Sequence, residues 1–173
     1  MSGRPYATPG VAKVASDVAP DIGAALGKRI LVVEDSPSAR RLLQGLLLRL
    51  GVTLPDLRLA ANVPEALQVF TRWMPEIAFI DLELRAGPPS DLGTEPDGTP
   101  RKYAANGAEL AVQLIQRDPQ LRVIICSASE PEGPLLAPLL KSGRILSMTK
   151  PILASHVAEA LARATAPRAS TPR

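Results

Sequence analysis

The amino-acid sequence predicts a three-layer α/β protein, with a doubly wound sheet of five parallel strands covered by helices on both faces. Short apolar runs alternate five times with segments whose apolar residues recur at helical spacing. The short runs are apolar throughout, as in parallel strands that are buried on both faces. Aromatic residues make up only 3% of a chain that is 46% hydrophobic, so we expect a core of aliphatic side chains.

The first three strands and two helices follow from residues 29–81. We expect a strand over 29–33 and a helix from Pro37, because Ser36 can cap it and proline suits the first helical position. Gly51 ends that helix. Its apolar stripe is Leu42, Leu43, Leu46, Leu47 and Leu50. A strand over 57–61, a helix over 64–73 and a strand over 77–80 come next. The inward residues of this helix are Ala66, Leu67, Phe70 and Trp73.

The second half continues the alternation after a long polar segment. We expect a helix over residues 106–117, with Leu110, Leu114 and Ile115 as its apolar positions. The other elements are a strand over 123–127, a short irregular helix over 134–142 that contains Pro138, a strand over 145–148 and a helix over 152–164. The stripe of the last helix is Leu153, Val157, Ala160, Leu161 and Ala164.

The pattern divides the chain into one folded domain and two flanking segments. The domain covers residues 28–164, residues 1–27 form a flexible N-terminal segment, and residues 165–173 form a disordered tail. Residues 86–105 form an insertion that begins AGPPSDLGTEPDGTP and is longer than most connections in compact domains. Two interpretations of it stay open, a tolerated disordered loop or a segment that binds a partner or covers the site.

Composition and charge argue against several classes of protein. The net charge of +3 comes from the flanks. The sequence has no compact basic patch with aromatic partners, so we do not expect it to bind nucleic acid directly. No apolar run reaches the length of a membrane span, and the N-terminus lacks the apolar core of a signal peptide. The lone Cys126 fits a reducing compartment and a small buried side chain. We therefore expect a soluble cytoplasmic protein.

Polar side chains follow the ends of four predicted strands. Glu34 and Asp35 follow the first strand, Asp81 ends the third, Ser127 ends the fourth and Lys150 follows the fifth. The carboxyl ends of parallel strands lie at one edge of the sheet, where α/β proteins bind their ligands. We therefore expect these five side chains to form one site.

This set of side chains suits phosphoryl transfer. Three clustered carboxylates repel one another unless a cation joins them, and Mg²⁺ prefers carboxylate and phosphate oxygens. Asp81 is suited to attack a phosphoryl group, because carboxylates can form aspartyl phosphates. Lys150 could pair with a phosphoryl oxygen as a point charge, and the Ser127 hydroxyl could donate to another oxygen. The sequence therefore predicts a phosphoryl acceptor site.

The ordered set Glu34-Asp35, Asp81, Ser127-Ala128 and Lys150-Pro151 resembles the receiver domain of two-component response regulators over roughly residues 28–164. The resemblance implies a flavodoxin-like fold and transfer of phosphate to Asp81 from a histidine kinase or a phosphotransfer protein. It also implies a Mg²⁺ site made by Glu34, Asp35, Asp81 and the backbone carbonyl of Glu83. Ser127 would be the hydroxyl switch, and Asp81 and Lys150 would carry the chemistry. Such a domain signals and is not an enzyme in the usual sense.

The sequence departs from the receiver pattern in three places. Ser147 stands where receivers usually carry an aromatic switch residue, three positions before the lysine. The loop after the acceptor strand is longer than usual, so that Asn106-Gly107 takes the place of an Asp-Gly pair before the third helix. The fourth helix contains Pro138. The acceptor chemistry is therefore expected to be intact and the signal output to be atypical.

Output would be a change in binding, either to a downstream protein or to a second copy through the fourth and fifth helices. No output domain is expected in the 173 residues, so the chain is a single-domain regulator or a fragment. A non-phosphorylated pseudo-receiver is the alternative function. Asp81-Leu82-Glu83 also loosely resembles the Asp-x-Asp of haloacid-dehalogenase-type phosphatases, although their second acid is Asp. His156 is assigned to surface or edge packing. Arg40-Arg41 is assigned to a solvated helix face, with contact to a partner as the alternative.

Overall fold

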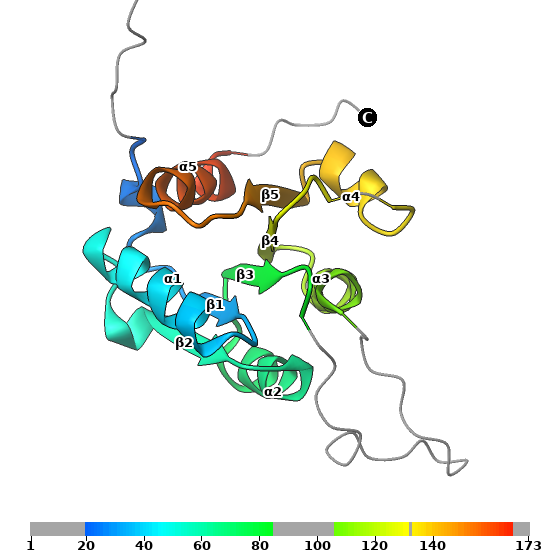
Figure 1. The fold of residues 1–173 in the computed structure, drawn as a ribbon, viewed down its shortest axis with the longest axis horizontal. Coiled ribbons are helices and arrows are strands. Elements are labelled where there is room, and N and C mark those ends of the chain that lie inside the picture. The colour runs from blue at the N-terminus through cyan, green and yellow to red at the C-terminus, as the bar shows by residue number, and fades with distance from the viewer. Residues whose placement is uncertain (1–19, 85–105, 132, 168–173) are drawn as a thin grey trace, which may run out of the picture.

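The computed structural model describes residues 20–84, 106–131 and 133–167. One sheet of five parallel strands lies between two layers of helices (Figure 1), in the order β2-β1-β3-β4-β5. The strands are β1 Ile30–Val33, β2 Leu57–Ala60, β3 Ile77–Asp81, β4 Arg122–Ser127 and β5 Ile145–Thr149. This is the predicted flavodoxin-like, doubly wound sheet, and the predicted fold class is confirmed.

Helices cover the two faces of the sheet unequally. They are α1 Pro37–Arg49, α2 Val63–Trp73, α3 Gly107–Arg117, α4 Ala137–Lys141 and α5 Ala154–Thr165, with 3-10 turns η1 Gly23–Ala25 and η2 Leu54–Asp56. One core lies between the sheet and α1 and α5, and the other lies beneath α2, α3 and α4. Neighbouring residues of β1, Leu31 and Val32, enter opposite cores, as expected for a strand buried on both faces.

Local side-chain bonds set the helix starts. Ser36 Oγ accepts a hydrogen bond from the backbone N–H of Ala39 at 3.4 Å, and Pro37 takes the first turn of α1, as predicted. At α2, the Asn62 side chain accepts from the N–H of Glu65 at 2.9 Å, and the Glu65 carboxylate accepts from the N–H of Ala61 at 2.7 Å. This reciprocal capping starts α2 one residue earlier than predicted.

The predicted apolar stripes are not buried along their whole length. Leu42 is exposed, because it lies at the margin of the α1 stripe while Leu43, Leu46 and Leu47 fill the core. Leu153 is exposed because it precedes α5, which begins at Ala154. Trp73 is half-buried at the end of α2, and the guanidinium of Arg58 lies over its ring at 4.9 Å.

The fourth helix is shorter than predicted. It covers Ala137–Lys141, and residues 133–136 form a turn in place of its first part. Pro138 is therefore in the first turn of the helix, where its missing N–H costs no intrahelical bond. Leu136 remains fully buried against the sheet, so the turn still covers the core.

Part of the predicted flexible lead-in packs on the domain. Ala25 of η1 is fully buried, in the core that contains α1 and α5. The predictions for residues 1–19, the 86–105 insertion and residues 168–173 fall outside the described residues. Within the described part of the chain, no helix has the length and apolar character needed to span a membrane.

Candidate functional site

Three carboxylates converge at the carboxyl edge of the sheet. Glu34 and Asp35 follow β1, and Asp81 ends β3, the strand that pairs directly with β1. One carboxylate oxygen from each residue lies within 4.8 Å of the others. Glu34 and Asp81 are buried, and Asp35 is half-buried. The structure therefore brings together the acids that the sequence places at strand ends.

Lys150 joins two of these carboxylates. Its Nζ lies 2.9 Å from Asp81 Oδ1 and 3.2 Å from Glu34 Oε2. The Lys150 side chain is 25% exposed, whereas the Glu34 and Asp81 side chains are 4% and 5% exposed. A partly hydrated cation thus offsets two buried anions, which would otherwise repel each other strongly.

Burial and charge shift the protonation of this group. Burial, together with the negative charge of Asp81, raises the pKa of Glu34 above its ordinary value, although Lys150 and the N–H of Ser36 oppose the rise. Burial tends to lower the pKa of Lys150, but its hydrogen bonds and ion pairs with Asp81 and Glu34 raise it overall. Lys150 therefore stays charged, and Glu34 holds a proton more readily than a surface glutamate does.

Backbone amides orient the two buried carboxylates. The N–H of Ser36 donates to Glu34 Oε1 at 3.1 Å, and the N–H of Glu83 donates to Asp81 Oδ1 at 3.2 Å. The side chain of Glu83 is exposed and lies outside the carboxylate cluster. The clustered acids supply hard oxygen ligands with more negative charge than Lys150 alone balances, so the donor set fits Mg²⁺.

Ser127 lies at the end of β4, on the strand next to β3. It is buried, one residue beyond Cys126, which pairs in register with Asp81. Its Oγ accepts a hydrogen bond from the N–H of Ser129 at 3.3 Å, and its carbonyl accepts from the N–H of Lys150 at 2.7 Å. Ser127 and Lys150 are therefore fixed to each other through the backbone at the edge that carries the acids.

Arg40 is a site residue that sequence reasoning missed. Its Nη1 donates to the carbonyl of Glu34 at 2.6 Å and to that of Asp35 at 3.4 Å. The prediction that Arg40 lies on a solvated face is wrong. Helical side chains point toward the helix N-terminus, so an arginine in the first turn of α1 can reach back to the acidic turn. The position of Arg40 in the first helical turn after Glu34 and Asp35 is the sequence signal that could have predicted this contact.

Gly107, the first residue of α3, lies directly against the backbone of Asp81. A Cβ at this position would lie 1.9 Å from the carbonyl oxygen of Asp81 and 2.8 Å from its carbonyl carbon. Asn106 caps the helix, because its side chain accepts from the N–H of Glu109 at 3.0 Å. The Asn-Gly pair noted in the sequence therefore lets α3 start directly against the backbone of Asp81.

Three other residues singled out in the sequence contribute no charged or ligating side chain to this cluster. Cys126 is buried, and desolvation raises the pKa of its thiol to about 12, so it packs as a small apolar side chain. His156 is half-buried on α5, beside β5, which agrees with the predicted edge packing. Ser147 lies in the middle of β5 and lines the same cavity as His156.

Comparison with known proteins gives one consistent picture. No family model matches the sequence. The chemotaxis protein CheY of Thermotoga maritima is 26% identical over 136 residues, which cover 79% of this chain and 96% of that protein. The chain is thus similar in sequence to a chemotaxis protein over nearly that protein's whole length.

Solved structures share the fold at lower identity. The receiver domain of NtrX from Brucella abortus has a TM-score of 0.58 and 23% identity, covering 79% of this chain and 97% of that one. A CheY-like receiver domain protein from Methanospirillum hungatei has a TM-score of 0.57 and 19% identity, covering 76% and 88%. The PhyR stress response regulator has a TM-score of 0.54 and 23% identity, covering 83% and 46%. The predicted resemblance to receiver domains is confirmed, and the chain has their fold.

Proposed function

We propose that this chain is a receiver domain that accepts a phosphoryl group on Asp81 from a histidine kinase or a phosphotransfer protein. The observation that carries the proposal is the set of contacts around Asp81. A buried carboxylate lies 2.9 Å from a lysine and beside two further acids, at the edge of the sheet where such folds bind ligands. Phosphorylation would then change binding to a downstream protein.

The contacts of Asp81 suggest which oxygen reacts. Lys150 and the N–H of Glu83 both engage Oδ1, so Oδ2 is the oxygen left to attack phosphorus. The Oδ2–P bond forms as the P–N bond of a phosphohistidine breaks, and the electron pair of that bond goes to the imidazole. Lys150 already touches Asp81, so it is placed to pair with an oxygen of the transferred group.

Glu34, Asp35 and Asp81 would hold Mg²⁺, with the backbone carbonyl of Glu83 as a further ligand. Bound Mg²⁺ would neutralise charge on the transferring phosphoryl group. Arg40 would keep the Glu34–Asp35 turn in place through its carbonyls. The Ser127 hydroxyl would turn from the N–H of Ser129 toward a phosphoryl oxygen, and this movement would report phosphorylation.

The proposed function also has a cellular location and a set of partners. The protein would act in the cytoplasm as a signalling module, without turnover of an external substrate beyond its own phosphorylation and dephosphorylation. Direct contact with nucleic acid or membrane is not part of the proposal, and a homodimer through α4 and α5 is one possible output. A non-phosphorylated pseudo-receiver is the second candidate, favoured by the small Ser147 in the middle of β5.

Intact-protein mass spectrometry after incubation with Mg²⁺ and acetyl phosphate tests the acceptor function. We expect one added phosphoryl group on the wild-type protein and none on Asp81→Asn or after chelation of the metal. Glu83→Gln is a matched control, because only the backbone of Glu83 is engaged at the site. A protein that takes up no phosphoryl group and also fails to bind beryllofluoride would favour the pseudo-receiver.

A further inference from the structure

The two outer edges of the sheet are protected to different degrees. β2 forms one edge and β5 the other. The carbonyl of Ala60 in β2 accepts from the N–H of Glu34 and so faces β1, which by alternation turns Leu57 outward. Arg58 Nη1 bonds the carbonyl of Leu57 at 2.9 Å and those of Leu54 and Pro55 at 3.3 Å. A charged side chain therefore covers the outward carbonyl at the start of the β2 edge.

The β5 edge has no such cover within the described chain. The N–H of Lys150 donates to the carbonyl of Ser127 at 2.7 Å, so the backbone groups of Lys150 face β4. Alternation along a parallel strand then turns those of Ile145, Ser147 and Thr149 outward. None of the hydrogen bonds among the described residues reaches the outward groups of Ser147 or Thr149. Residues 145–149 also lack charged side chains and proline, which usually guard an edge.

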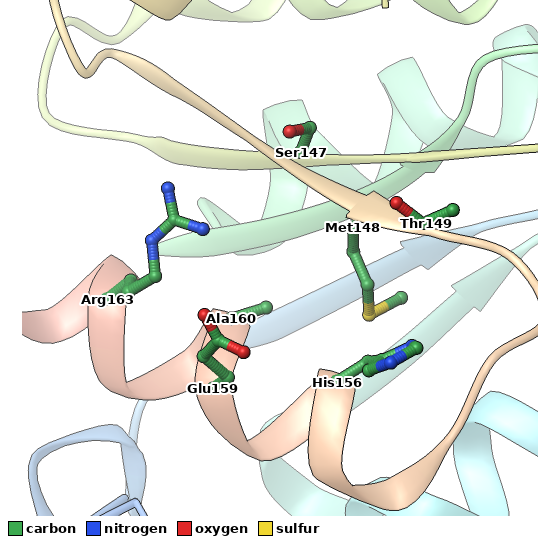
Figure 2. A pocket seen from close by; sticks show the side chains of 7 residues that line it. All are labelled: Ser147, Met148, Thr149, His156, Glu159, Ala160 and Arg163. Carbon is green, nitrogen blue, oxygen red and sulfur yellow. The ribbon is translucent and has the colours of Figure 1, made fainter. Parts of the chain in front are cut away.

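A cavity of about 290 Å³ runs beside this edge, between β5 and α5 (Figure 2). Ser147, Met148 and Thr149 line it from the strand. His156, Glu159, Ala160 and Arg163 line it from the helix. In Figure 2 the side chains of Glu159 and Arg163 project from the α5 ribbon on the side of β5. Both are exposed, and neither makes an ion pair with another described residue.

We propose that this edge pairs with the same edge of a second copy of the chain. Ile145, Ser147 and Thr149 are placed symmetrically about Ser147, so two β5 strands can pair antiparallel about a two-fold axis at Ser147. The two sheets become one continuous sheet. The α5 helices then lie alongside each other, and Glu159 faces Arg163 of the partner subunit. Because the contact is isologous, the second Arg163 meets the partner's Glu159 in the same way.

This contact differs from a dimer built on the fourth and fifth helices. Its bonds come from the backbone of β5, and α4, which has only five residues, takes no part. The inference does not depend on phosphoryl transfer, so it can fail while the acceptor proposal stands.

Sedimentation equilibrium of the full chain and its charge variants tests the contact. We expect wild-type protein to pass from monomer to dimer as its concentration rises. Glu159→Arg alone and Arg163→Glu alone each place like charges across the axis and should weaken dimerisation at least about tenfold. An equimolar mixture of these two variants should dimerise again, because each subunit then complements the other. Arg41→Glu, a charge reversal on the exposed part of α1, should leave dimerisation unchanged.

A backbone variant tests the edge pairing itself. Ser147→Pro removes an N–H that faces away from β4, so this variant should fold and stay monomeric. Wild-type protein that remains monomeric at all concentrations would overturn the inference. Charge variants that dimerise as wild type does, or a mixture that stays monomeric, would also overturn it, even if Ser147→Pro fails to fold.

Discussion

A lysine–glutamate pair lies at each end of the neighbouring strands β1 and β3, and the two pairs differ in almost every other respect. Before the strands, Lys28 Nζ lies 2.8 Å from Glu76 Oε1, with side chains 45% and 38% exposed. After them, Lys150 Nζ lies 3.2 Å from Glu34 Oε2, with side chains 25% and 4% exposed. A hydrogen bond from Lys28 lowers the pKa of Glu76, whereas burial raises the pKa of Glu34.

The difference comes from solvent and from a further acid. Water screens the exposed pair, which therefore contributes little to stability. At the other end Asp81 shares Lys150 with Glu34, and little water reaches either carboxylate. The excess of buried negative charge at the carboxyl edge suits a divalent cation, whereas the lysine–glutamate pair at the amino edge is only a surface contact.

Removing each lysine in turn should give the largest difference in stability between the two ends. Lys150→Ala leaves two buried carboxylates without their cation and should cost about 3 kcal/mol of unfolding free energy in metal-free protein. Lys28→Ala should cost at most about 1 kcal/mol. Urea unfolding with and without Mg²⁺ measures both, and Mg²⁺ should recover part of the loss in Lys150→Ala only. Similar losses for the two variants would contradict this account.

A side chain at Gly107 should disturb the carboxyl edge of the sheet and leave the amino edge unchanged. Gly107→Ala forces its Cβ onto the carbonyl of Asp81 and should cost about 1–3 kcal/mol, with slower phosphorylation from acetyl phosphate. Gly45→Ala is the matched control. Nothing lies within 4 Å of a Cβ at this helical position, so alanine should stabilise by about 0.5–1 kcal/mol. A harmless Gly107→Ala would mean that α3 does not hold the turn.

The pH dependence of Mg²⁺ binding should report the raised pKa of Glu34. Only the carboxylate binds the metal, so affinity should fall by up to about tenfold per pH unit below that pKa, starting above the ordinary 4.5. In metal-free protein the sign reverses, because a raised folded pKa gives stability that is lost as pH rises through it. Calorimetric titration with Glu34→Gln as control measures this. An unchanged affinity down to pH 4.5 would refute it.

The smallest effect belongs to Glu76. Its folded pKa is lowered, so its contribution to stability is present above the ordinary value of 4.5 and is lost as pH falls through the folded value. Glu76→Gln should therefore remove a small acid-sensitive part of the unfolding free energy, at most about 1 kcal/mol at neutral pH. High salt should erase the difference between the two proteins. A loss as large as that in Lys150→Ala would remove the contrast between the two ends.

The sequence predicted the residues that meet at the carboxyl edge because strand ends and alternation determine that placement. Asp81, Glu34 and Lys150 are far apart in the chain, yet parallel strands bring their ends to one edge. Because the strands are buried on both faces, they are continuous apolar runs, and their positions could be predicted from the sequence. The role of each residue in phosphoryl transfer stays a prediction.

Contacts that depend on side-chain reach or backbone approach could not be predicted in this way. The bond from Arg40 to the carbonyl of Glu34 depends on where α1 starts, and the constraint at Gly107 depends on how closely α3 approaches β3. The exposure of Leu42 depends on the rotation of α1 against the sheet. None of these quantities can be read from the spacing of residues along one segment.

Mapping the phosphoryl group to one residue shows directly whether Asp81 is the phosphoryl acceptor. Wild-type protein treated with Mg²⁺ and acetyl phosphate is reduced with borohydride, which converts an aspartyl phosphate into an alcohol, and its peptides are sequenced by mass spectrometry. We expect the reduced residue at position 81 and unmodified carboxylates at Glu34 and Asp35. A reduced Asp35, or modification that persists in Asp81→Asn, would contradict it.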